Sequence, residues 1–271
     1  MKKRVLSAIL MILIFVPLLI IGGRVFAIFM SILAIMGLYE LIHIRESKKE
    51  FPFLMKVFAY VMVVFFALSH FNSIDFVYTM DYRVVAFMIF AFLSPMVFIH
   101  DFKRYNLNDA LFLIGSVLFI GLSFNLLIIC RNYDIMYIIY LLLITTITDT
   151  FALFTGMLVG KHKLCPIVSP KKTIEGLLGG VFVGTFVATA FYVTVINSSA
   201  SLPFIIVLTV ILSLVGQLGD LVFSSIKRYY DKKDFSNLIP EHGGILDRFD
   251  SLIFVVLAFI IFSSVLYGGT Q

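Results

Sequence analysis

Residues 202–228 read LPFIIVLTVILSLVGQLGDLVFSSIKR, in which an apolar run over 202–226 is followed by the cations Lys227 and Arg228. A helix rises about 1.5 Å per residue, so about 20 apolar residues cross the hydrocarbon core of a bilayer. The run is long enough to do so, and the two cations mark the point where it leaves the membrane. This stretch therefore predicts a transmembrane helix that ends at a charged loop.

Similar apolar runs fill the rest of the 271-residue chain. Hydrophobic residues make up 61% of it and charged residues 14%, against about 25% charged residues in an ordinary soluble domain. With a mean hydropathy of +1.07, this composition excludes a soluble globular protein, a disordered chain and a disulfide scaffold. We expect an all-α, polytopic integral membrane protein that forms a single membrane-embedded domain over 1–271. About nine transmembrane helices are predicted, near 5–22, 24–43, 52–70, 84–100, 109–130, 135–159, 174–196, 202–226 and 251–268.

The positive charges set the predicted orientation. When the loops alternate between the two sides, only Arg24, Arg83 and Arg131 of the 21 Lys and Arg residues fall opposite the N-terminus. Cytoplasmic loops carry the excess of Lys and Arg, so the N-terminus is expected in the cytoplasm and Gln271 on the far side. The first run lacks a small-residue cleavage site and is expected to stay as a helix. The net charge of +5 is thus a feature of topology, and no nucleic-acid partner is expected.

The loop over 227–250 carries equal numbers of positive and negative side chains. Its cations are Lys227, Arg228, Lys232, Lys233 and Arg248, and its carboxylates are Asp231, Asp234, Glu241, Asp247 and Asp250. Cations bind phosphates, carboxylates bind magnesium, and the adjacent Gly243 and Gly244 allow backbone to approach a ligand closely. The loop therefore fits a site that handles both anions and metal ions, while a solvated charged loop with a glycine turn is the alternative.

Asp220 and Asp149 lie inside predicted membrane helices. Asp220 is seven residues before Lys227, which places it about 10 Å into its helix at about 1.5 Å per residue. Asp149 lies deeper, among several threonines. A carboxylate at such a depth marks a functional site unless it is a buried polar residue that packs helices together. Asp247 and Asp250 are three residues apart, so at the start of a helix they share one face, where they can hold a metal or cap the helix.

The loop over 160–176 is basic. It contains Lys161, Lys163, Lys171 and Lys172, with no acid before Glu175. Ser169 and Pro170 precede the last two lysines, and Thr173 is placed to cap the helix that follows, whose N-terminus attracts anions. We interpret the loop as an anion-binding segment, although lipid headgroups or topology could use the same lysines. A basic loop paired with an acid-rich loop on one membrane face matches what nucleotide phosphoryl transfer requires.

The residues 224–250, SSIKRYYDKKDFSNLIPEHGGILDRFD, closely resemble the signature of the phosphatidate cytidylyltransferases, also called CDP-diacylglycerol synthases. Gly219-Asp220, the segment Ser169–Gly176, and Asp149-Thr150-Phe151-Ala152 followed by Gly156 also resemble motifs of this family. The resemblance covers about 145–255. It implies that about 135–271 supply the catalytic helices and cytoplasmic loops, and that about 1–134 are N-terminal helices without an assigned role.

Three positions depart from the family pattern. Phe223 stands where an acid usually precedes the first Ser of the signature, so one potential metal or base ligand is absent. Glu241 stands where Gly is common, and Leu153 replaces a frequent aromatic residue. These departures bear on the number of metal ions rather than on the class of reaction.

The resemblance implies a magnesium-dependent transfer of CMP from CTP to phosphatidic acid, which gives CDP-diacylglycerol and pyrophosphate. Asp220 and Asp247 are expected to hold Mg²⁺, with Asp149 and Asp250 supporting them or holding a second cation. Positive charge at Lys227, Arg228, Lys233 and Arg248 is expected to neutralise the phosphates, and His242 to orient a phosphate or an aspartate. The expected substrate-binding residues are Ser169, Lys171, Lys172, Thr173, Ser224, Asp234, Gly243 and Gly244.

The resemblance also implies a homodimer that spans the cell membrane, a bacterial inner membrane, with the active site facing the cytoplasm. The sequence leaves three other functions open. A related enzyme would activate a polyprenyl or ether-lipid phosphate with CTP, a transporter would use Asp149 and Asp220 as a proton or cation relay, and an inactive homologue would account for Phe223.

Overall fold

The computed structural model describes residues 2–69, 82–99, 101–198, 201–239 and 243–267. These residues fall into two compact units. Unit 1 comprises Met1–Asn132 with Asp234–Leu246, and unit 2 comprises Tyr133–Lys233 with Asp247–Gln271. The expectation of a single domain stays a prediction.

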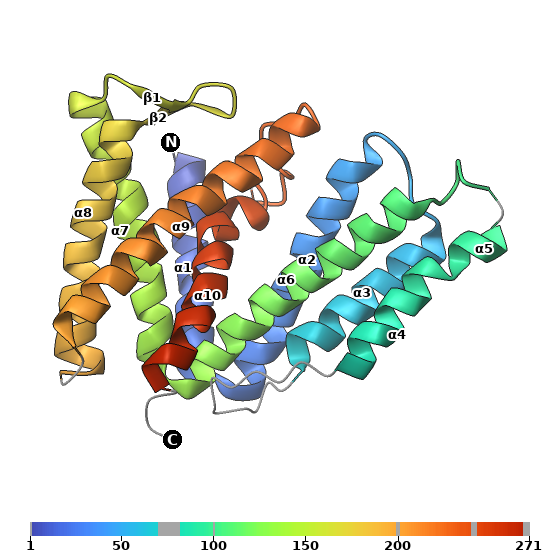
Figure 1. Ribbon diagram of the computed structural model, residues 1–271, viewed down its shortest axis with the longest axis horizontal. Helices are drawn as coiled ribbons and strands as arrows, with labels where there is room; N and C mark the ends of the chain where they lie inside the picture. The colour runs from blue at the N-terminus through green and yellow to red at the C-terminus, as the bar shows by residue number, and fades with distance from the viewer. Residues whose placement is uncertain (1, 70–81, 100, 199–200, 240–242, 268–271) are drawn as a thin grey trace. The chain divides into compact units, whose positions relative to one another are not determined.

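Unit 1 is helical. It contains α1 (Lys2–Ile21), α2 (Gly23–Glu46), α3 (Phe53–Leu68), α4 (Tyr82–Leu93), α5 (Pro95–Ile99) and α6 (Leu107–Tyr133). Figure 1 shows α2, α3 and α6 side by side. The contact between α3 and α6 is close, because a Cβ atom at Gly121 would lie 2.6 Å from Phe66 Cβ.

Unit 1 also buries a carboxylate, Asp109, at the start of α6. Its side chain is 1% exposed and accepts hydrogen bonds from Arg45, at 3.0 Å, and from Lys49. A buried charge is tolerated when it is paired and hydrogen-bonded in this way. Asp109 thus ties the start of α6 to the end of α2.

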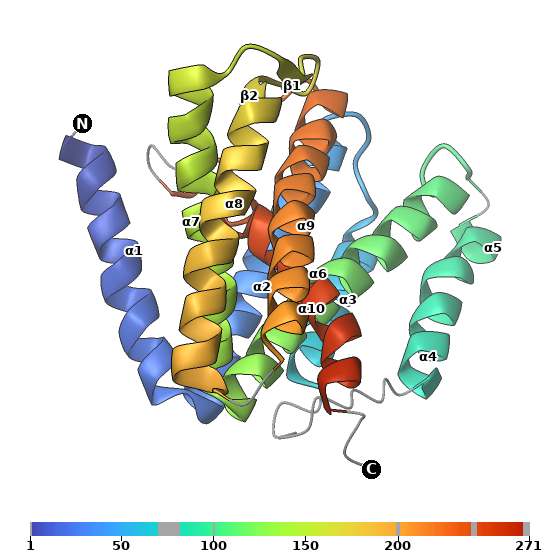
Figure 2. The ribbon, with the colours of Figure 1, turned by 60° about the vertical axis from the view of Figure 1, so that its left-hand side comes forward.

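Unit 2 contains α7 (Ile135–Val159), a hairpin of β1 (Lys163–Cys165) and β2 (Ser169–Thr173), α8 (Ile174–Phe191), a π-helical turn η1 (Tyr192–Ile196), α9 (Leu202–Tyr229) and α10 (Leu246–Tyr267). The strands are antiparallel, with Lys163 opposite Thr173 and Cys165 opposite Ser169. Figure 2 shows the hairpin at the end of the unit where α8 begins.

The structure confirms the all-α class, since the hairpin holds the only named strands among the described residues. Each of the nine predicted runs coincides with a helix or a pair of helices. Run 84–100 is such a pair, because Pro95 has no N–H to continue the helix after Ser94. By length and composition, six segments of the described chain can cross a membrane: Gly23–Glu46, Tyr82–Ile99, Leu107–Tyr133, Ile135–Val159, Ile174–Ile196 and Leu202–Tyr229. The number of crossings and the orientation of the N-terminus stay predictions.

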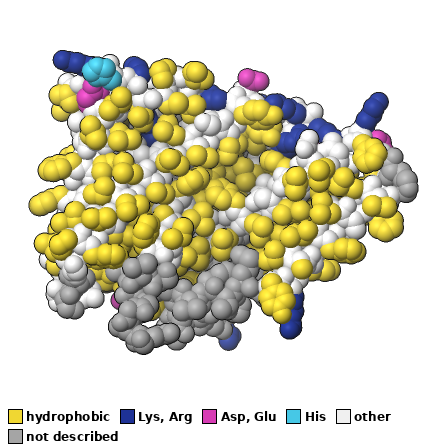
Figure 3. Space-filling view, viewed as in Figure 1, with side chains coloured by type: hydrophobic (Ala, Val, Ile, Leu, Met, Phe, Trp, Pro, Cys, Tyr) yellow, Lys and Arg dark blue, Asp and Glu magenta, His cyan; other side chains and the backbone are white. Residues whose placement is uncertain are grey.

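Apolar side chains cover the helices on the face seen in Figure 3, whereas most charged side chains lie along the upper edge of the view. Phe182 and Phe186 of α8, for example, are 75% and 71% exposed. In water such a surface would drive aggregation, but it suits lipid. The described chain is a membrane protein whose polar groups collect near helix ends.

Three glycines at intervals of four residues allow α8 to pack tightly on α7. A Cβ atom at Gly180 would lie 2.5 Å from the Thr148 carbonyl oxygen, and Gly176 and Gly184 face α7 equally closely. Small residues at this spacing are typical of membrane helices whose backbones approach each other.

Replacing Gly180 by alanine is therefore expected to destabilise unit 2 by about 1–3 kcal/mol, the usual range for overpacking. Thermal unfolding of the purified protein in detergent measures this change. Gly115→Ala is the control, because a Cβ atom there would meet nothing within 4 Å. Equal stability of the two variants would show that the α7–α8 contact is not tight.

Candidate functional site

The polar end of unit 2 brings together residues from four elements. Asp149 lies on α7, Asp220 on α9, Asp247 and Asp250 on α10, and Lys172 on β2. These elements are distant in sequence, and hydrogen bonds or ion pairs connect their side chains.

Lys172 lies at the centre of one network. Its ammonium group is 2.6 Å from Asp220 Oδ2 and donates a hydrogen bond to Gln217 Oε1 at 3.1 Å. The Gln217 amide nitrogen in turn donates to Asp149 Oδ1 at 2.5 Å. Ser224 donates to the other Asp220 oxygen at 3.2 Å. The network joins the carboxylates of α7 and α9 to a lysine of the hairpin.

Three of the carboxylates predicted as metal ligands interact with one another electrostatically: Asp149, Asp220 and Asp250. Lys172 acts on Asp149 in the same way, and Lys227 acts on Asp250. Neighbouring carboxylates repel each other, so positive charge is needed to hold the group together. The structure supplies that charge from two lysines, and a bound cation would supply it equally well.

A buried ion pair lies next to this group. Lys227 Nζ is 2.6 Å from Asp247 Oδ1, and the two side chains are only 11% and 3% exposed. Asp247 is in the first turn of α10, which begins before the predicted run 251–268, so Asp247 and Asp250 both lie at the start of a helix. The pair joins the end of α9 to the start of α10.

The basic loop 160–176 forms the β-hairpin, whereas the sequence predicted only an anion-binding segment there. Successive side chains of a strand point to opposite faces, and on β2 Lys171 is exposed while Lys172 is turned inward. Thr173 caps α8 as predicted, because its hydroxyl oxygen accepts the Gly176 N–H at 3.1 Å. Ser169 begins the strand and is half-buried.

The cations at the end of α9 differ in their surroundings. Arg228 donates to the Val168 and Lys232 carbonyl oxygens, at 3.4 and 3.1 Å, and so ties the end of α9 to the hairpin. Lys233 and Arg248 are exposed. Their roles in phosphate binding stay predictions.

The middle of the signature belongs to unit 1. Asp234 there is exposed, and Gly243 has a φ of 80°, a left-handed conformation that favours glycine. Gly244 is buried against the carboxylate of Glu40. His242 and Glu241, predicted on this loop, lie outside the described residues.

Phe223, at the position where the family usually has an acid, is fully buried. Its ring packs edge-on against Phe254 of α10, with centroids 6.1 Å apart. The position has become part of the apolar core between α9 and α10.

Sequence reasoning missed two residues of unit 2. Gln217 bridges Lys172 and Asp149, and its only signal was an amide within an apolar run. Glu175 closes the hairpin, because its carboxylate accepts from the His162 ring nitrogen at 2.6 Å and from the N–H groups of Lys161 and His162.

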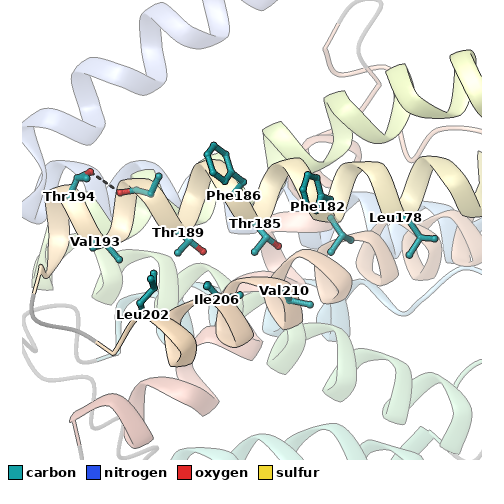
Figure 4. Close-up of a pocket in the computed structure, with 12 residues that line it drawn as sticks. Leu178, Phe182, Thr185, Phe186, Thr189, Val193, Thr194, Leu202, Ile206 and Val210 are labelled. Atoms are coloured by element: carbon teal, nitrogen blue, oxygen red, sulfur yellow. Dashed lines mark hydrogen bonds between the residues drawn. The ribbon is translucent and has the colours of Figure 1, made fainter.

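An apolar groove begins near this polar end and runs between α8 and α9, as Figure 4 shows. Its volume is about 680 Å³. Leu178 and Phe182 line it on α8, and Ile206 and Val210 line it on α9. Leu178 is five residues beyond Thr173, about 8 Å along the helix at about 1.5 Å per residue.

The donor set suits a hard divalent cation. Within the ranges that the structure describes, no three His, Cys, Asp or Glu residues are grouped as ligands of one ion. Mg²⁺ is usually held by one or two carboxylates together with substrate phosphates, not by a cage of protein groups. The carboxylates at this end of unit 2 include Asp149 of α7, Asp220 of α9 and Asp250 of α10.

The fold and the site together define an integral membrane protein with carboxylates and lysines at one end of a helical unit, suited to a phosphate-bearing ligand and a cation. The model of the cytidylyltransferase family matches residues 2–266. The chain belongs to this family.

Curated relatives support this membership over nearly the whole chain. A phosphatidate cytidylyltransferase of Staphylococcus haemolyticus (strain JCSC1435) is 37% identical over 257 residues, which are 94% of this chain and 96% of the relative. A protein of the same name from Staphylococcus aureus (strain COL) is 38% identical with the same coverage. Another, from Staphylococcus epidermidis (strain ATCC 12228), is 36% identical.

Proposed function

We propose that this chain transfers the CMP group of CTP to phosphatidic acid, forming CDP-diacylglycerol and releasing pyrophosphate. The observation that carries the proposal is the network of Lys172, Asp220, Gln217 and Asp149 at the polar end of unit 2. Relatives that are 36–38% identical and named for this reaction support the same substrates.

The residues of the site suggest how the transfer is assisted. A phosphate oxygen of the lipid attacks the α-phosphorus of CTP and expels pyrophosphate in line. Because the attacking phosphate is already ionised near neutral pH, placement and charge neutralisation matter more than a strong general base. Lys172 and Lys227 are the buried or half-buried cations, and Lys171, Arg228, Lys233 and Arg248 are the more exposed ones.

Magnesium belongs to the proposal. Asp220 and Asp247, with Asp149 and Asp250 in support, would hold Mg²⁺ together with the triphosphate. When bound, the ion would neutralise charge on the triphosphate and on the departing pyrophosphate. Asp220 would exchange Lys172 for the ion, and Asp247 would exchange Lys227, which frees both lysines for phosphate oxygens.

The groove between α8 and α9 supports a lipid substrate. Its apolar walls fit the acyl chains, while the charged end of unit 2 holds the headgroup. We further propose a homodimer in the cell membrane with this end facing the cytoplasm, where CTP is available. Mass measurement of the purified protein in detergent tests the dimer.

A comparison of lipid acceptors tests the reaction class. The purified protein receives α-³²P-labelled CTP and Mg²⁺ with phosphatidic acid, a polyprenyl phosphate or an ether-lipid phosphate. We expect label to enter a CDP-lipid with phosphatidic acid at least tenfold faster than with the others. Preference for another lipid phosphate would replace the proposed acceptor, and no transfer to any of them would reopen transport and the inactive homologue.

A further inference from the structure

The first half of the chain contributes a buried carboxylate to the signature loop. Glu40 of α2 is completely buried, and its carboxylate accepts hydrogen bonds from three described residues of the segment Asp234–Leu246. Ser236 Oγ and the Ile245 N–H donate to Oε1 at 2.7 and 2.8 Å, and the Leu246 N–H donates to Oε2 at 2.8 Å. Both carboxylate oxygens are therefore used to hold this segment.

Apolar contacts reinforce these hydrogen bonds. Ile245 and Leu246 are buried, and so is Phe235 near the other end of the segment. The Leu246 side chain packs over Gly37, one turn before Glu40, where an added Cβ would lie 3.1 Å from Leu246 Cδ2. The segment thus packs on one face of α2 through apolar contacts around the Glu40 carboxylate.

Gly244 has no room for a side chain because of Glu40. A Cβ atom at Gly244 would lie 2.3–2.5 Å from the three carboxylate atoms. Contacts under 3.0 Å require a shift, and although these atoms are the end of a flexible side chain, the carboxylate is buried and hydrogen-bonded to Ile245 and Leu246. We therefore expect a side chain at Gly244 to disturb the carboxylate on α2.

Glu40 also acts on the start of α10. Leu246 is its first residue, and a carboxylate that accepts a first-turn N–H stabilises a helix N-terminus. The next residue in the chain is Asp247, and Asp250 follows within the same turn. Glu40 thus holds the residue that directly precedes Asp247 in the chain.

We infer that Glu40 is a positioning residue for the transfer reaction: it holds the described residues of the signature segment, 234–239 and 243–246, on α2 in the conformation that the reaction requires. The inference rests on the proposed function for its link to catalysis. It also gives the N-terminal helices a role in the reaction.

The test compares Glu40→Gln and Glu40→Asp with Asp109→Asn in the full-length protein. An amide at position 40 offers one acceptor oxygen and directs a donor NH₂ at the N–H groups, whereas aspartate keeps the charge. Asp109→Asn is the matched control, since it removes another buried carboxylate of unit 1 that does not contact the loop. Label transfer is expressed per folded molecule, and hydrogen exchange is measured on peptides covering 236–248.

We expect Glu40→Gln to lower transfer at least tenfold and to speed exchange of the Ile245 and Leu246 amides at least tenfold, with part of both recovered by Glu40→Asp. Asp109→Asn should leave exchange over 236–248 and transfer per folded molecule unchanged. Wild-type exchange at these amides in Glu40→Gln, or equal losses of transfer per folded molecule in Glu40→Gln and Asp109→Asn, would overturn the inference.

A second pair of variants keeps the test independent of folding losses. Gly244→Ala should lower transfer at least tenfold in the natural background. In the Glu40→Ala background it should lower transfer less than threefold relative to Glu40→Ala alone, because the added methyl group then fits. Additive losses would contradict the contact. If the wild-type protein transfers no label, the proposed function fails, while the exchange measurement still decides whether Glu40 anchors the loop.

Discussion

Lys227→Met is expected to leave little folded protein. It removes one partner of an ion pair whose carboxylate, on Asp247, is only 3% exposed. Removal of one partner of a buried ion pair destabilises a protein by about 3–5 kcal/mol. Thermal unfolding in detergent and the yield of monodisperse protein measure the loss. Arg228→Met serves as the control, because its side chain is exposed and its removal should change stability by less than about 1 kcal/mol.

The double variant Lys227→Met/Asp247→Asn separates folding from activity. It removes both charges, so most of the stability should return, since neutral replacement of a buried pair is often tolerated. If the pair serves CTP and Mg²⁺ binding, the folded double variant should still transfer label at least 100-fold more slowly than the wild type. A stable Lys227→Met protein would contradict the buried pair, and an active double variant would remove the pair from the site.

Asp220→Asn is expected to reduce transfer at least 100-fold without loss of fold, about 3 kcal/mol of transition-state stabilisation at about 1.4 kcal/mol per tenfold. Asparagine is nearly isosteric and can still accept from Ser224, while Lys172 keeps its bond to Gln217. The negative charge that would hold the cation is lost. Initial rates at saturating CTP, compared at equal amounts of folded protein, measure the effect.

The control for this variant is Asp134→Asn. Asp134 caps α7 by accepting the Met136 N–H at 2.9 Å, and asparagine caps helices about as well. It should keep wild-type stability and activity. An Asp220→Asn protein with near-wild-type transfer would show that this carboxylate does not hold the metal.

The helices follow from the sequence because hydropathy acts locally. Each apolar run coincides with helical structure, and the one break missed, at Pro95, lies within a run that stays apolar on both sides. Thr173 was predicted as a cap from its position before a helix, and its hydrogen bond agrees. The strands of the hairpin were not predicted, because they are short and polar and are paired only with each other.

Pairings between distant residues could not be read in the same way. Lys172 and Asp220 were both selected, but nothing in the sequence indicated that they contact each other or that Gln217 links them to Asp149. The sequence indicated one charged loop over 227–250. In the structure some of its charges, such as Lys227, are buried in an ion pair, whereas others, such as Lys233, are exposed. Glu40 was not predicted as a functional residue, because the first half of the chain resembles the family only in being hydrophobic.

The most direct measurement compares α-labelled with γ-labelled CTP in parallel reactions of the wild-type protein with phosphatidic acid, with Mg²⁺ and with a chelator. We predict that α-label enters the lipid and that γ-label is released as pyrophosphate in equal amount. Both the incorporation and the release should stop when the metal is removed. Label from CTP that never enters lipid, from a folded and lipid-supplied preparation, would contradict it.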